Sequence, residues 1–520
     1  TLAAGCADRH VSRCGGWMDS RKTCRIVLEK LRAPSLSQIG GTPPRDQQIS
    51  VAMSVRKPRK PTSSSSPLGL PLLPLMLICA VLALSFLHLS VALSGNLNPS
   101  EAVLSACASH PAGGYPEGPA GVPLLIAMEW IFTGSGIGPL RWISSVALLV
   151  LSLCVWWIGR HLAPHRQAVA LWAVLAFNLL PQVTIASLVM NGSMVTASAI
   201  FLSFVAGWRA VRSSGGGTLS AWSLFGIVMG VATLFFYPVA WLLPAALAAR
   251  FYFQGVKSFP WKGGLLALGF LLLGWVIPLS WNARHDWIQW SSVAPAFDSI
   301  HVGGFTASLG IVLALSALLT PILMLLAFQR LWVRLILLAV GLTAAGLSAL
   351  LLLSPSLIPE GFPSPIGVGG IRVLADSVSS LRDERPDAKG EKAIVIAGTP
   401  GLAALLGNSL PIDYPERPGS PSVFMAESPS LNSSFALWPG YADAVAASVK
   451  DPLYTEEKSV SPFLGRNALY ITTESKEELP QTITGAFNAV ALLQEVPITV
   501  NGKQQILRIY QCEAYRSLSL

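Results

Sequence analysis

Long apolar segments separated by short polar turns fill most of the chain between residues 70 and 354. The first apolar segment, 70–93, is roughly 24 residues long, which is enough to cross a bilayer. Similar segments follow at 140–159, 168–188, 195–211, 221–238, 239–253, 263–281, 307–328 and 331–354. Residues 122–132 are apolar but too short to cross, so we expect them at the membrane interface. The pattern predicts a polytopic α-helical membrane protein with about nine spans.

The pattern changes after residue 357, where charged residues, Pro and Gly return. Helices are expected at 367–385, 401–406 and 482–494, and strands at 393–397, 423–426 and 468–472. A hairpin is expected from 498–500 and 506–510, with Asn501 and Gly502 at its turn. Strands that alternate with helices predict a C-terminal soluble α/β domain with a partly parallel sheet over residues 358–520.

Residues 1–69 precede the first apolar segment and have no hydrophobic period. We expect a disordered tail, followed by a transmembrane domain over 70–357. Met53 opens a stretch with four basic residues and a run of serines. Our hypothesis is that the natural protein starts at Met53.

Basic residues predict the orientation of the spans. With the N-terminus in the cytoplasm, the following residues fall on the cytoplasmic side, as the positive-inside rule requires: Arg160, His161, Arg166, Arg209, Arg212, Arg250, Lys257, Lys262, Arg330 and Arg334. An odd number of spans then places residues 358–520 outside. The sequence predicts a multi-pass protein of the cytoplasmic (inner) membrane whose C-terminal domain is periplasmic or extracellular.

Composition agrees with a membrane protein. Charged residues make up only 12% of the chain, against about 25% in soluble domains. The net charge of +9 comes largely from the tail and the ends of apolar segments, so we expect no nucleic-acid partner. None of the seven cysteines forms a Cys-x-x-Cys pair. Only Cys107 and Cys512 fall outside in this topology, which leaves a disulfide between them open.

Candidate chemistry is concentrated in the first outer loop, residues 97–123. This loop carries Glu101 and Glu117 and has no Lys or Arg. A carboxylate at the outer membrane surface can act as a general base. The alternative is an ordinary connector with two solvated acids.

Three stretches carry a family resemblance. The first is Ser-Glu at 100–101, followed by Tyr-Pro-Glu-Gly-Pro at 115–119. The second and most specific is Pro-Leu-Ser-Trp-Asn-Ala-Arg-His-Asp-Trp at 278–287. The third comprises 435–441 and 465–472. Across roughly residues 70 to 515, the chain resembles the protein-mannosyltransferase-like membrane glycosyltransferases of bacteria, the group that includes the aminoarabinose transferase of lipid A.

The resemblance implies a C-type glycosyltransferase fold and a polyprenyl-phosphate sugar as donor. The implied function is sugar transfer to a lipid, glycan or protein acceptor on the outer face of the cytoplasmic membrane. Three positions depart from the family pattern. Ser100 replaces the Asp that is the usual base, 191–195 lacks an acidic turn, and 235–237 lacks a Lys. The alternative is therefore a non-catalytic relative, acting as a partner or transport component in envelope glycolipid assembly.

The resemblance and the residue types together assign roles. Glu101 is the expected base, one position after Ser100. Glu117 is expected to position the sugar, and a divalent metal ion at Glu117 is left open. The expected substrate-binding residues are Tyr115, Arg284, His285 and Asp286, with Arg284 meeting the phosphate. We expect Glu101, Glu117 and Arg284 to line one outward-facing cavity.

Overall fold

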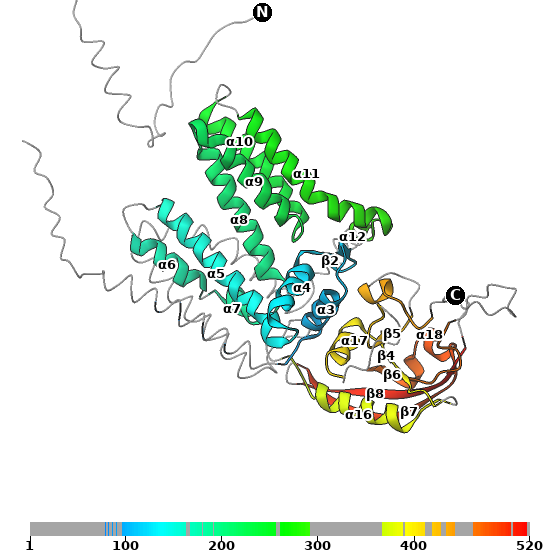
Figure 1. Ribbon diagram of the computed structural model, residues 1–520. Coiled ribbons are helices and arrows are strands. Elements are labelled where there is room, and N and C mark those ends of the chain that lie inside the picture. Colours follow the sequence, from blue (N-terminus) through cyan, green and yellow to red (C-terminus); the bar gives the residue numbers. More distant parts are fainter. Residues whose placement is uncertain are drawn as a thin grey trace, which may run out of the picture. The chain divides into compact units, whose positions relative to one another are not determined.

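The computed structural model describes most of the chain between residues 96 and 516 (Figure 1). The described ranges are 96–162, 167–178, 180–190, 192–255, 260–291, 367–387, 390–410, 419–427, 433–442, 461–500 and 503–516, with Cys79, Leu82, Phe86 and Ser90. The tail, the start at Met53, the spans at 307–328 and 331–354, and most of 70–93 lie outside the described residues.

Three helices in the described part are long and apolar enough to cross a membrane. They are α5 (Ile137–Leu162), α8 (Ser193–Arg212) and α11 (Trp261–Arg284). They match the spans predicted at 140–159, 195–211 and 263–281. The total of about nine spans and the side on which the C-terminal domain lies stay predictions.

The remaining apolar helices are shorter. They are α4 (Gly121–Thr133), α6 (Gln167–Asn178), α7 (Pro181–Leu188), α9 (Thr218–Ala232) and α10 (Leu242–Gln254), the last preceded by the 3₁₀ helix η2 (Tyr237–Trp241). The prediction of one continuous span at 168–188 was wrong, because the chain breaks before Pro181. Leu180 has an extended backbone there, which is the conformation favoured before proline.

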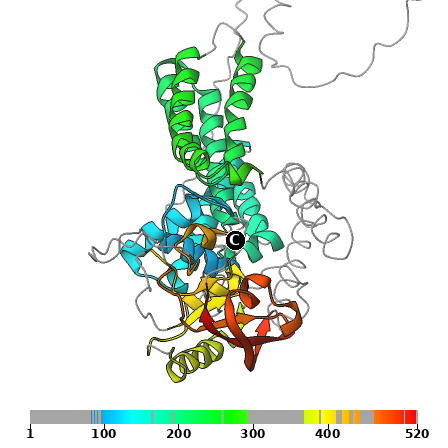
Figure 2. The ribbon, with the colours of Figure 1, turned by 90° about the vertical axis from the view of Figure 1, so that its right-hand side faces the viewer.

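Helices α8 to α11 run side by side (Figure 2). Small residues allow the closest of these contacts. Gly230 of α9 and Gly274 of α11 face each other so tightly that a Cβ on Gly274 would overlap the Gly230 backbone. Such close approach of backbones is typical of helix pairs in membranes.

The C-terminal part forms a mixed six-stranded sheet in the order β3-β7-β8-β6-β4-β5. Its strands are β3 (Val368–Gly369), β4 (Ile394–Ala397), β5 (Phe424–Met425), β6 (Ala468–Thr472), β7 (Phe487–Val500) and β8 (Lys503–Tyr515). Strand β4 runs parallel to β5 and β6, and the other pairs are antiparallel. The sheet is therefore partly parallel, as its sequence pattern predicts.

Both faces of this sheet are covered, and alternate residues of β4 face opposite sides. Val395 and Ala397 pack in one cluster with α16 (Ile371–Glu384) and α17 (Pro400–Gly407). Ile394 and Ile396 pack in a second cluster, on the side of α18 (Gln481–Thr484). Burial on both faces explains why β4 is apolar at every position.

The helix predicted at 482–494 was wrong. Helix α18 ends at Thr484, and residues from Phe487 onward belong to β7. The Ala and Leu residues of this stretch favour a helix locally. Pairing with β8 from Phe487 to Val500 overrides that preference. The ladder ends with Val500 opposite Lys503, and the turn predicted at Asn501 and Gly502 lies outside the described residues.

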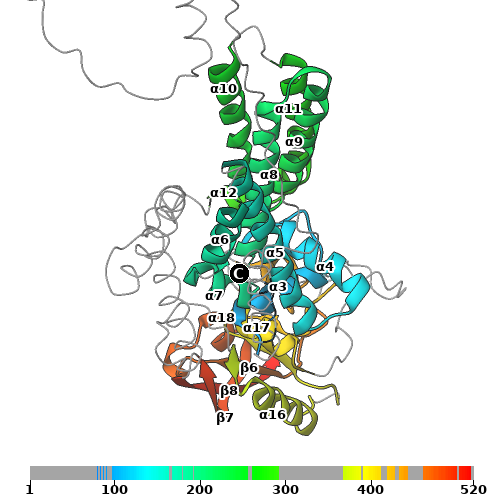
Figure 3. The same cartoon turned by 90° about the vertical axis from the view of Figure 1, so that its left-hand side faces the viewer.

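Helix α3 (Pro99–Ser109), in the loop at residues 97–123, joins the apolar helices to the six-stranded sheet. It lies beside α17 (Figures 1 and 3). Ala102 belongs to the apolar cluster of the sheet, and Ser105 Oγ donates to Asn408 Oδ1 at 3.0 Å. The N–H of Val368, in β3, donates to the carbonyl of Leu97 at 3.1 Å. The loop that carries the candidate acids is thus packed against the C-terminal sheet and its helix α17.

Candidate functional site

Glu101 lies in the first turn of α3, where it completes a capping box with Asn98. Its carboxylate and the guanidinium of Arg141 on α5 are both fully buried. Arg141 binds with two atoms, Nε to Oε1 at 2.8 Å and Nη2 to Oε2 at 2.7 Å. The Met190 N–H donates to Oε1 at 2.8 Å, and the Asn98 N–H donates to Oε2 at 2.9 Å. Glu101 therefore ties α3, α5 and the segment after α7 together.

These contacts change the expected role of Glu101. A carboxylate has about four lone-pair sites, and five N–H donors, among them Asn98 Nδ2 at 3.4 Å, already contact the oxygens of Glu101. No lone pair is left to take a proton from an acceptor. The surroundings of Glu101 are those of a structural ion pair, and the neighbouring Ser100 is exposed on α3.

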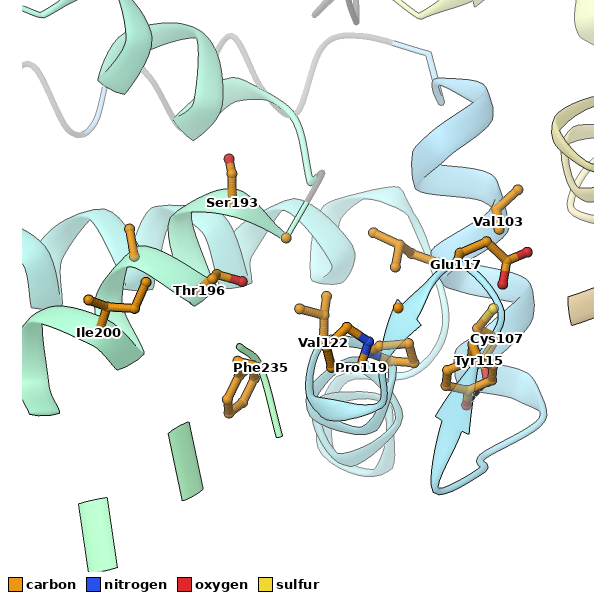
Figure 4. Close-up of a pocket in the computed structure, with 15 residues that line it drawn as sticks. Val103, Cys107, Tyr115, Glu117, Pro119, Val122, Ser193, Thr196, Ile200 and Phe235 are labelled. Carbon is orange, nitrogen blue, oxygen red and sulfur yellow. Dashed lines mark hydrogen bonds between the residues drawn. The ribbon is translucent and has the colours of Figure 1, made fainter. Parts of the chain in front are cut away.

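Glu117 lies at a cavity of about 410 Å³ (Figure 4). It follows the short hairpin strand β1 (Gly114–Tyr115) and precedes β2 (Gly118–Pro119). The walls are mainly apolar and come from α3, α4, α8 and the turn after α9, with Val103, Val122, Ile200 and Phe235 among them. Among the described residues that line the cavity, Glu117 is the only charged one. The hairpin thus places one carboxylate against an apolar space.

Ser434, the first residue of the 3₁₀ helix η5 (Ser434–Leu437), holds the Glu117 carboxylate. The Ser434 N–H donates to Oε1 at 2.8 Å, and the Ser434 hydroxyl makes a very short hydrogen bond to Oε2. The nearby Trp438 ring stacks on His110, which follows α3, with ring centroids 4.3 Å apart. Each Glu117 oxygen accepts one of these bonds and keeps capacity for a second acceptor contact.

Cys107 and Tyr115 also line this cavity, both as protonated groups. Burial raises the pKa of the Cys107 thiol to about 12, and the thiol donates to Ser434 Oγ at 3.4 Å. Burial likewise raises the pKa of Tyr115, whose hydroxyl lies 2.9 Å from the Cys107 carbonyl and accepts from the Ala112 N–H at 3.0 Å. Tyr115 therefore braces the loop, and no bond to a substrate group is needed to explain its position. The disulfide between Cys107 and Cys512 is absent, since both are free thiols.

The segment 278–287 carries the most specific part of the sequence resemblance. It packs against the β1–β2 hairpin. Trp281 packs against Gly114, where an added Cβ would lie 2.7 Å from the ring. Asn282 Nδ2 donates to Gln289 Oε1 at 2.7 Å. Gln289 Nε2 in turn donates to the carbonyls of Tyr115 and Gly118, each at 2.8 Å. These contacts fix the backbone on both sides of Glu117.

We expect one methyl group added at Gly114 to disturb the packing of the hairpin on Trp281. Gly114→Ala forces the loop away from Trp281 and should cost about 1–3 kcal/mol of stability, as overpacking does. The change should appear as a lower Tm of the purified protein in detergent. Gly217→Ala is the matched control, because a Cβ there meets nothing within 4 Å. Equal melting of both variants and the parent would show that the loop does not depend on this contact.

Arg284, His285 and Asp286 lie just beyond this support, at the end of α11. His285 stacks on the Trp281 ring, with centroids 4.2 Å apart, and its Nδ1 lies 2.8 Å from the Trp281 carbonyl. Asp286 has φ +52°, a left-handed conformation at the point where the chain turns after the helix. Arg284 is exposed and does not line the Glu117 cavity. Of Glu101, Glu117 and Arg284, the structure therefore brings only Glu117 to this cavity.

Comparison with known proteins gives a structural likeness only. No family model matches the sequence, and no curated protein matches it. The fold is similar to the crystal structure of ArnT from Cupriavidus metallidurans in the apo state, with a TM-score of 0.47 and 13% identity over 84% of this chain and 97% of that chain. The same ArnT bound to undecaprenyl phosphate gives a TM-score of 0.46 at the same identity and coverage. At this identity and these TM-scores, the likeness assigns neither a family nor an activity.

The described residues offer too few ligands to bind a metal ion by themselves. No three His, Cys, Asp or Glu side chains come together in the part of the chain that the structure describes. At the cavity only Glu117 offers a carboxylate, and both of its oxygens already accept hydrogen bonds from Ser434. The described residues therefore do not form a complete metal site at this cavity.

Three residues central to this site were missed from the sequence. Arg141 carried a usable signal, because an arginine at the start of an apolar helix needs a partner. Gln289 lies within a few residues of the 278–287 motif but had no distinguishing pattern. Ser434 carried no signal, since it is 317 residues from Glu117 in sequence.

Proposed function

We propose that the protein is a membrane glycosyltransferase that takes a sugar from a polyprenyl-phosphate donor, with Glu117 as general base. The observation that carries this proposal is the position of Glu117, the only charged residue among the described ones that line an apolar cavity beside a helix long and apolar enough to span a membrane. The motif at 278–287, similar to that of polyprenyl-phosphate glycosyltransferases, supports the proposal because it holds the same loop in place.

The reaction follows from these groups. An acceptor hydroxyl or amine attacks the anomeric carbon of the sugar, and its proton passes to the Glu117 carboxylate. The bond between the anomeric carbon and the phosphate oxygen breaks, and polyprenyl phosphate leaves with the electron pair. The apolar walls around Val122 and Phe235 accommodate the isoprenoid part of the donor.

A second candidate is a non-catalytic relative that binds a polyprenyl-phosphate lipid without turning it over. Two observations favour it. Glu101 is fully used in an ion pair and Ser100 replaces the acid expected before it. Ser434 already donates to both oxygens of Glu117. Such a protein would act as a partner or transport component in glycolipid assembly.

The lipid-linked sugar pool of a deletion strain distinguishes the two candidates. A glycosyltransferase predicts that its polyprenyl-phosphate sugar donor accumulates, and that the parent gene restores the pool while Glu117→Gln does not. Restoration by both genes would favour the non-catalytic candidate. An unchanged pool would contradict both.

Ser434 is expected to act through Glu117, as a positioning residue. Ser434→Ala removes a hydrogen bond to a charged group, and such bonds contribute about 1.5–3 kcal/mol. We expect kcat to fall about tenfold or more with little change in KM, because only the orientation of the base is lost. Ser434→Thr, which keeps the hydroxyl, should restore most of the rate.

Steady-state kinetics with a fixed donor provides the measurement. Ser433→Ala is the matched control, since the Ser433 hydroxyl points to Met425 Sδ at 3.4 Å and not to Glu117. If Ser433→Ala and Ser434→Ala lower kcat equally, the effect is a general loosening of this segment and Ser434 does not position Glu117.

A further inference from the structure

A second cavity, of about 500 Å³, lies between α8, α9 and α10. Small residues make the hollow, chiefly Gly207 on α8 with Ala245 and Ala249 on α10, and the exposed rings of Phe204 and Phe253 flank it. This volume falls within the range of small-molecule sites. Its lining is almost wholly apolar, which suits a hydrocarbon chain.

The cavity is at the opposite end of α8 from Glu117. Ser193, the first residue of α8, lines the Glu117 cavity, and Arg212, the last, lines this one. A helix of 20 residues is about 30 Å long, which is the thickness of the hydrocarbon core of a bilayer. The two cavities therefore lie toward opposite ends of α8, and this one does not depend on the proposed function.

Cations gather at this end of the helices. The Arg212 guanidinium lies 4.4 Å from the centre of the Trp208 ring, and the exposed Arg209 is in the same turn. No Asp or Glu occurs anywhere from residue 130 to residue 285. The helices themselves therefore supply no carboxylate to neutralise these arginines.

Buried donors beside the cavity also lack an acceptor. Trp208 Nε1, on a residue that lines the cavity, has no hydrogen-bond partner in the described part of the chain. Arg250 is only 4% exposed; its Nη1 donates to the Val211 and Ser213 carbonyls at 2.6 Å, yet its Nε has no partner among the described residues. Buried donors without acceptors are unfavourable. These two N–H groups are inaccessible from the cavity, so the site itself combines an apolar hollow with a cation at its lining.

We infer that this cavity binds one anionic phospholipid. An acyl chain occupies the hollow between α8 and α10, and the headgroup phosphate accepts from the exposed Arg212 guanidinium. Basic pockets between membrane helices are known to hold anionic headgroups in this way. A phospholipid fits better than a free phosphate ion, because a free ion would leave the apolar hollow unfilled.

Native mass spectrometry of the purified full-length protein tests this inference. The probes are phosphatidylglycerol and phosphatidylcholine with identical acyl chains, and inorganic phosphate alone. We expect one phosphatidylglycerol to be retained in preference to phosphatidylcholine. Arg212→Gln should lower its apparent affinity about tenfold, and Ala245→Leu, which fills the hollow at an exposed position, should lower it without changing charge.

Arg160→Gln is the matched control. Arg160 is also exposed and also lies over a tryptophan, Trp156, but it is not among the residues that line this cavity. Circular dichroism and gel filtration confirm that each variant is folded. Equal retention of the two lipids, equal loss in Arg160→Gln and Arg212→Gln, or no effect of Ala245→Leu would overturn the inference. Displacement of the lipid by millimolar inorganic phosphate would assign the site to a free anion instead.

Discussion

Replacing Arg141 by methionine should destabilise the protein by about 3–5 kcal/mol, because the Glu101 carboxylate is then left buried without its cation. The pair has no contact with water, so solvent cannot compensate for the missing charge. The expected result is a large fall in Tm and in the yield of monodisperse protein in detergent. This is the largest effect on stability that we predict.

The double variant Glu101→Gln/Arg141→Met tests whether the loss of stability in Arg141→Met comes from the unpaired carboxylate. It leaves no uncompensated charge, so it should be more stable than Arg141→Met alone. Arg160→Gln, at the other end of α5, is the control and should melt with the parent, since Arg160 is exposed. If Arg141→Met also melts with the parent, Glu101 is not held by a buried ion pair and its assignment as a structural residue is wrong.

Replacing Glu117 by glutamine should lower the rate of sugar transfer by about two to four orders of magnitude, the usual contribution of a general base. The amide keeps the size of the side chain but cannot accept the acceptor's proton. Because Glu117 is exposed and lies at the surface of the loop, we expect Tm to stay near that of the parent. The measurement is kcat with a polyprenyl-phosphate sugar and a saturating acceptor.

Glu101→Gln is the informative comparison for this variant. It should lower the folded fraction, yet the folded molecules should keep much of their activity, because Glu101 does not line the cavity. The opposite pattern, with Glu117→Gln active and folded Glu101→Gln inactive, would return the role of base to Glu101.

The fold was predictable where one periodicity dominates. The helices α5, α8 and α11 follow directly from unbroken apolar segments, and β4 and β6 from short apolar runs. Residues 482–494 were mispredicted because their local helix preference opposes a pairing with β8 that only tertiary structure supplies. Short apolar helices such as α10 show a similar limit, since length alone does not establish a span.

The candidate site was predictable only in part. The sequence pointed to the loop at 97–123 and to Glu117, which does face a cavity. It could not distinguish the two acids, because the difference lies in distant partners: Arg141 saturates Glu101, whereas Ser434 leaves capacity on Glu117. The sequence identified Arg284 as a cation near the 278–287 motif, but it could not show that Arg284 is the last residue of α11 and does not line the cavity.

The most direct test of the proposed function is the release of polyprenyl phosphate by the purified protein. The parent protein, in lipid nanodiscs, is supplied with polyprenyl-phosphate sugars and an acceptor fraction from the deletion strain. The proposal predicts that one donor is converted to free polyprenyl phosphate, that release requires the acceptor fraction, and that Glu117→Gln abolishes it. Release that is equal in Glu117→Gln and the parent, or no release from any donor, would contradict it.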